Sequence, residues 1–298
     1  MSVADRHVPR AAGSVFRSRT MLALWLALVA ACLWTMRETW NDLINIVSLD
    51  EEQSHIILVP FVAVWLGWIR RVRLRHLSPT GTLFGPVIIL IGWFMSWVGF
   101  HHAIQAAWHA GAVVTLVGAL VTGLGVNTLL KLFPAFAVLA FAVPLPGAIR
   151  HAVAGPLQTA GAQATQVILE TFGVPIERSM NLLTLNGHDI AVAEACNGMR
   201  MVLALILVTY AFAFSIPFRG YARAIVLVAS PMVALACNVV RLIPTTLFYG
   251  YSSQSFADAF HDASGWLMLP VAFLALRGIH TVLGWAQVPV TRFNLAYQ

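Results

Sequence analysis

Long runs of apolar residues, separated by short polar segments, dominate the chain from residue 20 onward. A helix that crosses a membrane needs roughly 20 consecutive residues that are mostly apolar. This criterion predicts eight spans, at approximately 20–36, 54–69, 83–100, 103–123, 128–148, 197–216, 223–247 and 264–284. The first span follows a basic stretch, as a signal peptide does. Because no small-residue cleavage site comes after it, we interpret it as a retained transmembrane helix.

The composition agrees with a single integral membrane domain over residues 1–298. Hydrophobic residues make up 59% of the chain and charged residues only 10%, which is more apolar surface than a soluble domain of this length needs. The net charge of +6 does not indicate nucleic-acid binding, because the arginines cluster between the apolar segments. Three cysteines without a CxxC spacing argue against a disulfide scaffold and a zinc site. We expect no metal and no cofactor.

The basic residues also predict an orientation in the membrane. With eight spans, the basic clusters before the first span, after the second, and between the sixth and seventh all lie on one side. The positive-inside rule makes that side cytoplasmic, and both termini then lie there. The loops predicted on the opposite side carry acidic residues, namely Asp42, Asp50, Glu51, Glu52, Asp258 and Asp262.

Residues 150–195 are predicted to lie outside the membrane, on the periplasmic side. Apolar residues recur at helical spacing through the glutamine-bearing segment 150–173, which predicts an amphipathic helix in the interface. Two short alternating segments, 181–185 and 188–192, flank Asn186-Gly187, which is typical of a β-hairpin with a type I′ turn. The predicted fold class is an all-α polytopic membrane protein with about eight transmembrane helices, a small periplasmic β-hairpin and an interfacial helix.

Three reactive side chains are predicted at the same depth of the membrane. Cys196 opens the sixth span at its outer end, and His261 lies in the predicted outer loop 251–264. Arg241 comes roughly 18 residues into the seventh span, which carries it about 27 Å across the bilayer. A thiol at a helix N-terminus has a lowered pKa and forms the thiolate more readily. With an arginine for the oxyanion and a histidine for proton transfer, the trio supports acyl transfer.

Several alternatives remain open at this point. Arg200 lies one helical turn after Cys196 and is a second candidate for the counterion of the thiolate. His261 acts either as a base or as half of a thiolate–imidazolium pair. The remaining cysteines, Cys32 and Cys237, are ordinary small apolar residues in this interpretation. A transporter or polysaccharide-assembly scaffold is the alternative outside the enzymes, although the chain shows no internal repeat typical of transporters.

Four motifs in order resemble those of the exosortases, a family of membrane cysteine transpeptidases related to the archaeosortases. They are Ser54-His55-Ile56-Ile57-Leu58-Val59-Pro60, Ala195-Cys196-Asn197-Gly198-Met199-Arg200, Asn238-Val239-Val240-Arg241, and His261 followed by Gly265-Trp266. The resemblance implies that Cys196 is the nucleophile, Arg241 the oxyanion or substrate stabiliser, and His261 the acid/base. It adds four supporting residues: Glu194, Arg200, Asn238 and His55.

The resemblance also implies a substrate class. Exosortases act on exported proteins whose C-terminal sorting signal combines a short motif, often Pro-Glu-Pro, with one transmembrane helix and a basic tail. The enzyme is expected in the bacterial inner membrane, often beside exopolysaccharide production. It would cleave at the outer face, form a thioester, and pass the acyl group to an acceptor that the sequence does not identify. The enzyme is expected to be surrounded by membrane lipid and to have no nucleic-acid partner. An intramembrane cysteine protease, with water as the acceptor, is the alternative.

The orientation predicts how the cysteines react in intact cells. A membrane-impermeant thiol reagent should label Cys196 from the periplasm and leave Cys32 unlabelled, because Cys32 lies in the middle of the first span. The measurement is mass spectrometry of the purified protein after labelling. Labelling of Cys196 only after permeabilisation would contradict the predicted sidedness.

Overall fold

The computed structural model is mostly helical and describes residues 19–74, 83–192, 198–216 and 220–285. Its elements are α1 (Arg19–Thr35), α2 (Arg37–Leu49), η2 (Glu51–Ile57), α3 (Leu58–Ile69), α4 (Arg71–Leu74), α5 (Phe84–His101), α6 (Gln105–Leu124), α7 (Val126–Lys131), α8 (Phe133–Ala137), η3 (Val138–Ala142), α9 (Gly147–Thr171), β1 (Glu177–Ser179), β2 (Leu182–Leu185), β3 (His188–Ala191), α11 (Gly198–Ser215), α12 (Gly220–Tyr251) and α13 (Gln254–Trp285).

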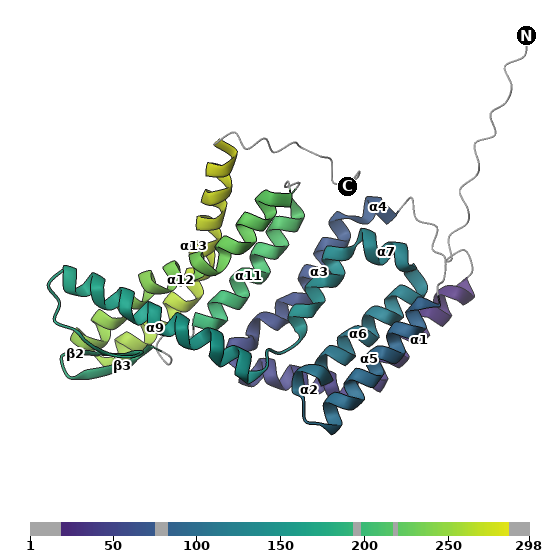
Figure 1. Ribbon diagram of the computed structural model, residues 1–298, viewed down its shortest axis with the longest axis horizontal. Coiled ribbons are helices and arrows are strands. Elements are labelled where there is room, and N and C mark those ends of the chain that lie inside the picture. The colour runs from purple at the N-terminus through teal and green to yellow at the C-terminus, as the bar shows by residue number, and fades with distance from the viewer. Residues whose placement is uncertain (1–18, 75–82, 193–197, 217–219, 286–298) are drawn as a thin grey trace, which may run out of the picture.

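The helices form two groups that meet at α3 and α11 (Figure 1). On one side α5 and α6 pack with α1 and α2. On the other side α11, α12 and α13 pack with α9 and the small sheet. An apolar core that includes Val59, Leu66, Val138 and Leu207 joins α3, η3 and α11 where the groups meet. Arg70 strengthens this junction because its guanidinium donates to the carbonyl oxygen of Phe214 at the far end of α11.

The predicted number of eight spans is not confirmed. By length and composition, four of the described helical stretches are apolar enough to cross a membrane: Glu52–Ile69, Phe84–His101, Gln105–Leu124 and Gly220–Tyr251. Three pairs of helices, each bent at a break, also meet the test, which raises the number to seven if each pair is one span. The helix Val202–Ser215 is apolar but shorter.

Two predicted segments are wrong in detail. The segment 128–148 is not one helix but the short helices α7, α8 and η3. Gly125, with a φ of +83°, ends α6, and Pro134 begins a new turn at the start of α8. Prolines lack the N–H that a continuous helix needs. The predicted loop 251–264 is also mostly helical, because α13 begins at Gln254 and includes His261.

The predicted hairpin is confirmed. β2 and β3 pair antiparallel, with Leu185 opposite His188 and Leu182 opposite Ala191. Asn186 and Gly187 between them both have positive φ, 53° and 77°, as a type I′ turn requires. A third strand, β1, adds to the other edge of β2 and was not predicted.

The helix predicted at 150–173 corresponds to α9. It buries one face, formed by Ala154, Gly161, Ala162, Thr165 and Leu169. With the segment Phe133–Ala142, to which it stands at 90°, it also meets the test for a broken span or a re-entrant loop. Its place in the membrane interface therefore stays a prediction.

The antiparallel helices α5 and α6 approach each other closely at their glycines. A Cβ atom at Gly92 would lie 2.5 Å from the backbone nitrogen of Thr115, and one at Gly99 would lie 2.2 Å from that of Trp108. Atoms in folded proteins do not approach so closely, so the two backbones touch only because these positions carry no side chain. Small residues play this part generally where membrane helices pack together.

This contact predicts opposite effects for two glycine substitutions. Gly92→Ala should lower the free energy of unfolding by about 1–3 kcal/mol, because the added methyl group forces α5 and α6 apart. Gly67→Ala in α3 is the control, because no atom lies within 4 Å of its added Cβ. The control should be neutral or stabilising by up to about 1 kcal/mol through helix propensity. Thermal unfolding in detergent measures both, and equal effects would contradict the close packing.

Candidate active site

A contact between Arg241 and His261 forms the centre of the candidate site. Arg241 Nη2 on α12 lies 2.9 Å from His261 Nε2 on α13. A guanidinium can only donate hydrogen bonds, so Nε2 accepts and the ring proton lies on Nδ1. His261 Nδ1 in turn faces Asp262 Oδ1 at 3.3 Å, where a carboxylate oxygen favours that proton. The arrangement selects one tautomer of a neutral imidazole.

Small and polar residues surround the Arg241 guanidinium, which is only 7% exposed. Gly265, one turn after His261, lies beside it, since a Cβ atom there would be 3.5 Å from Arg241 Nη1. Asn238, one turn before Arg241, is buried, and its Oδ1 has no hydrogen-bond partner among the described residues. A buried amide oxygen without a partner is costly and is typical of a site that receives a donor from a ligand.

The first turn of α11 lies at the same end of the bundle. Arg223 near the start of α12 donates to the carbonyl oxygen of Ala213, so α11 and α12 run antiparallel. Farther along, Val202 of α11 shares an apolar cluster with Cys237 of α12 and Met268 of α13. One turn beyond this cluster, α11 reaches Gly198 and α12 reaches Arg241, each after about 6 Å of helical rise.

The structure does not describe several of the predicted site residues. Cys196 and Glu194 belong to the segment 193–197, which lies outside the described residues. For Arg200 the structure describes the backbone as part of α11 but not the side chain. The structure thus brings Arg241 and His261 of the predicted set into contact, with Asn238 one turn before Arg241 on α12, beside Gly161 of α9. Asp262 is an addition, because the sequence analysis treated it only as an acidic residue on the outer side.

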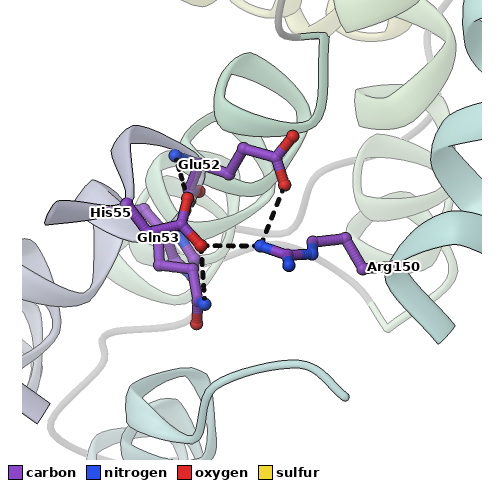
Figure 2. Close-up of polar contacts among 5 residues, drawn as sticks. Glu52, Gln53, His55 and Arg150 are labelled. Atoms are coloured by element: carbon purple, nitrogen blue, oxygen red, sulfur yellow. Dashed lines mark hydrogen bonds and ion pairs between the residues drawn. The ribbon is translucent and has the colours of Figure 1, made fainter. Parts of the chain in front are cut away.

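His55 belongs to a separate polar cluster (Figure 2). It is buried on η2, and its Nδ1 lies 3.3 Å from the carbonyl oxygen of Glu52. Next to it, Arg150 Nη1 lies 2.6 Å from Asp50 Oδ2 and 3.2 Å from Glu52 Oε2. Gln53 Nε2 donates to the same Asp50 oxygen over 3.1 Å. We call the four residues Asp50, Glu52, Gln53 and Arg150 the Arg150 cluster.

The Arg150 cluster fastens the first turn of α9 to η2. Burial alone would raise the pKa of Asp50, but hydrogen bonds from Gln53, Arg150 and the Glu52 backbone outweigh it, so the pKa is lowered. The contacts of Arg150 with these acidic residues were not predicted from the sequence. A signal was present, because the predicted topology puts Arg150 on the same side of the membrane as the acidic residues 50–52.

The chemistry available at the centre is electrostatic stabilisation and proton transfer. A guanidinium stays charged at every physiological pH and donates to a developing oxyanion, while a neutral imidazole accepts a proton. Among the described residues, no group of three or more histidine, cysteine, aspartate or glutamate side chains is placed to hold a metal ion.

Comparison with known protein families identifies a match. A family model described as transmembrane exosortase matches residues 40–278, which include every predicted site residue. Comparisons with curated proteins and with solved structures return no match.

The Arg150 cluster predicts a pH-dependent contribution to stability. Arg150→Gln should lower the free energy of unfolding by about 1–2 kcal/mol at pH 7, because it leaves two carboxylates close together without their cation. The pKa of Asp50 is lowered on folding, so its contribution is present above its ordinary value of 3.8 and disappears as the pH falls through the lower folded value.

The measurement is thermal unfolding in detergent at pH 7 and below pH 4. Arg37→Gln is the matched control, since the Arg37 side chain is exposed and its contacts, 4.0 Å to Glu38 and 5.1 Å to the ring of Trp34, do not involve the Arg150 cluster. A difference between Arg150→Gln and the unmodified protein that persists unchanged at the lowest pH would contradict the role of these carboxylates.

Proposed function

The chain belongs to the transmembrane exosortase family, and we propose that it is a membrane cysteine transpeptidase. Its substrates are exported proteins with a C-terminal sorting signal made of a short motif, one transmembrane helix and a basic tail. It cleaves them at the outer face of the bacterial inner membrane. The observation that carries the proposal is the contact between the buried Arg241 and the partly buried His261, at the end of the bundle where α11 begins.

Cys196 is the nucleophile in this proposal. Only Asn197 separates it from Gly198, so covalent geometry limits the Cα atoms of Cys196 and Gly198 to a separation of about 7 Å. Gly198 begins α11 at the level of Arg241. This reach supports a thiol beside the Arg241–His261 pair. Glu194 and Arg200, on either side of Cys196, are supporting residues in the same proposal.

The reaction proceeds by addition and elimination. The Cys196 sulfur attacks the carbonyl carbon of the scissile peptide, and the electron pair of the C=O bond moves to oxygen. Arg241 stabilises this oxyanion. His261 Nε2 takes the thiol proton and delivers it to the nitrogen of the leaving peptide as the C–N bond breaks. A thioester remains, and an amine or hydroxyl acceptor attacks it to release the sulfur.

The Arg241–His261 contact has a defined part in this sequence. While Arg241 donates to Nε2, the lone pair that would accept the thiol proton is occupied. A guanidinium has five N–H donors, so a substrate carbonyl that draws Arg241 toward itself frees Nε2. Binding of the substrate carbonyl and activation of the thiol are thereby linked, which supports His261 as a base rather than a permanent imidazolium.

The proposal predicts the outcome of substituting each cysteine. In cells that express a signal-bearing substrate, Cys196→Ala should reduce processing by at least about 1,000-fold, because the covalent route is lost. Cys237→Ala is the matched control, since this buried thiol lies one turn before Arg241 and should leave processing intact. Immunoblotting of the unprocessed form measures the effect. If the Cys196→Ala variant processed the substrate normally, the assignment of Cys196 as the nucleophile would be refuted.

The same cells distinguish transfer from hydrolysis. Mass spectrometry of the new C-terminus of the processed substrate should show an added acceptor group. A free carboxylate in every molecule would instead assign the chain as a cysteine protease with water as acceptor, with the same residues at the site.

A further inference from the structure

A small cavity lies away from the candidate active site, where α1 bends into α2. Its volume is about 170 Å³, and its walls include Trp93, Trp97 and Phe100 of α5 and Trp108 of α6. The rings of Phe100 and Trp108 have centroids 5.5 Å apart and are inclined at 59°, so they form a corner rather than a stack. Several non-parallel aromatic faces therefore border one space.

The backbone arrangement keeps this space open. Ser96, a small and almost fully buried residue, lies at its base between the turns that carry Trp93 and Phe100. The rings of Trp93, Trp97 and Phe100 stay about half exposed, at 48%, 45% and 59%, and are not packed between α5 and α6. On the other side, α2 leaves α1 at an angle of 63°, which exposes the rings instead of covering them.

One charged side chain, Glu38, is among the described residues that line the cavity, and Arg37 lies 4.0 Å from its carboxylate. Glu38 is on its rim, and no lysine or arginine is among the described residues that line it. The neighbouring Arg37 lies over the ring of Trp34, 5.1 Å from its centroid, and neither residue is among those that line the cavity. Aromatic faces with a carboxylate beside them attract ammonium groups through the ring quadrupole and the opposite charge.

The position of the cavity identifies the source of such a group. α1 runs from Arg19 to Thr35 and α5 from Phe84 to His101, and the cavity lies where both end. At the end of a membrane helix the hydrocarbon gives way to lipid headgroups, and tryptophans gather at that level. An acyl chain alone would use neither Glu38 nor the adjacent Arg37, and a purely anionic headgroup would pair with Arg37 but not with Glu38.

We propose that this cavity binds the ammonium end of a zwitterionic aminophospholipid of the surrounding membrane. The ammonium group lies among the rings and pairs with Glu38, while the phosphate lies outside the rim toward Arg37. The adjacent opposite charges of Arg37 and Glu38, 4.0 Å apart, match the opposite charges of such a headgroup. The volume holds a headgroup end and not a whole lipid. This site is independent of the proposed transpeptidase activity.

The test compares two lipids that differ only in the headgroup. The full chain is purified in detergent, and native mass spectrometry measures its binding of dioleoyl phosphatidylethanolamine and dioleoyl phosphatidylglycerol. The ethanolamine lipid should bind roughly tenfold more tightly, the scale of a partly desolvated cation–π contact with an added ion pair. Equal binding of the two lipids would overturn the proposal.

Two cavity variants and one control test whether the preference for the ethanolamine lipid arises at this cavity. Glu38→Gln removes the carboxylate at an exposed position, and Trp97→Leu removes one aromatic wall. Each substitution should abolish most of the preference for the ethanolamine lipid. Trp68→Leu is the matched control, because this exposed tryptophan lies on α3 outside the cavity and should leave the preference unchanged. A preference that survives both cavity variants would also overturn the proposal.

Discussion

A buried positive charge within an apolar helix pair is the constraint on which this arrangement depends. Arg241 is almost fully enclosed between α12 and α13, where an unpaired charge would be strongly destabilising. α13 supplies a hydrogen-bond acceptor, His261 Nε2. One turn later it carries Gly265, which leaves space for the guanidinium. The depth and rotation of α13 relative to α12 are consequently coupled to this contact.

The helix α9 is held to its neighbours near both of its ends. The sheet packs its buried side chains, such as Leu183, Leu185 and Ile190, against α9 and α12. At its other end α9 is held to η2 by the Arg150 cluster. η2 packs against α11, and α12 packs against both α11 and α9. An apolar core and an ionic contact together therefore fix α9 and the sheet relative to α11 and α12.

Sequence reasoning succeeded where a local rule applied and failed where neighbours decided. The hairpin at Asn186-Gly187 follows from two positive-φ positions between alternating strands, and it is confirmed. The segment 128–148 was wrong because hydropathy measures how apolar a stretch is but not whether a residue without an N–H, such as Pro134, interrupts its hydrogen bonds. The segment 251–264 was wrong because its polar residues were taken to end a helix, whereas packing against α12 extends α13 through them.

The sequence by itself determined that this is a largely helical membrane protein, its family, and the residue types of its candidate chemistry. These follow from composition, spacing and ordered motifs, all of which are properties of neighbouring positions. The tertiary structure decided which of the ten histidines contacts Arg241 and which tautomer that histidine adopts. It also decided that Arg150 forms an ion pair with the acidic residues near η2. It also decided that four aromatic rings and Glu38 share one cavity. These contacts depend on the angles and depths at which helices far apart in the chain pack together, and no local pattern encodes them.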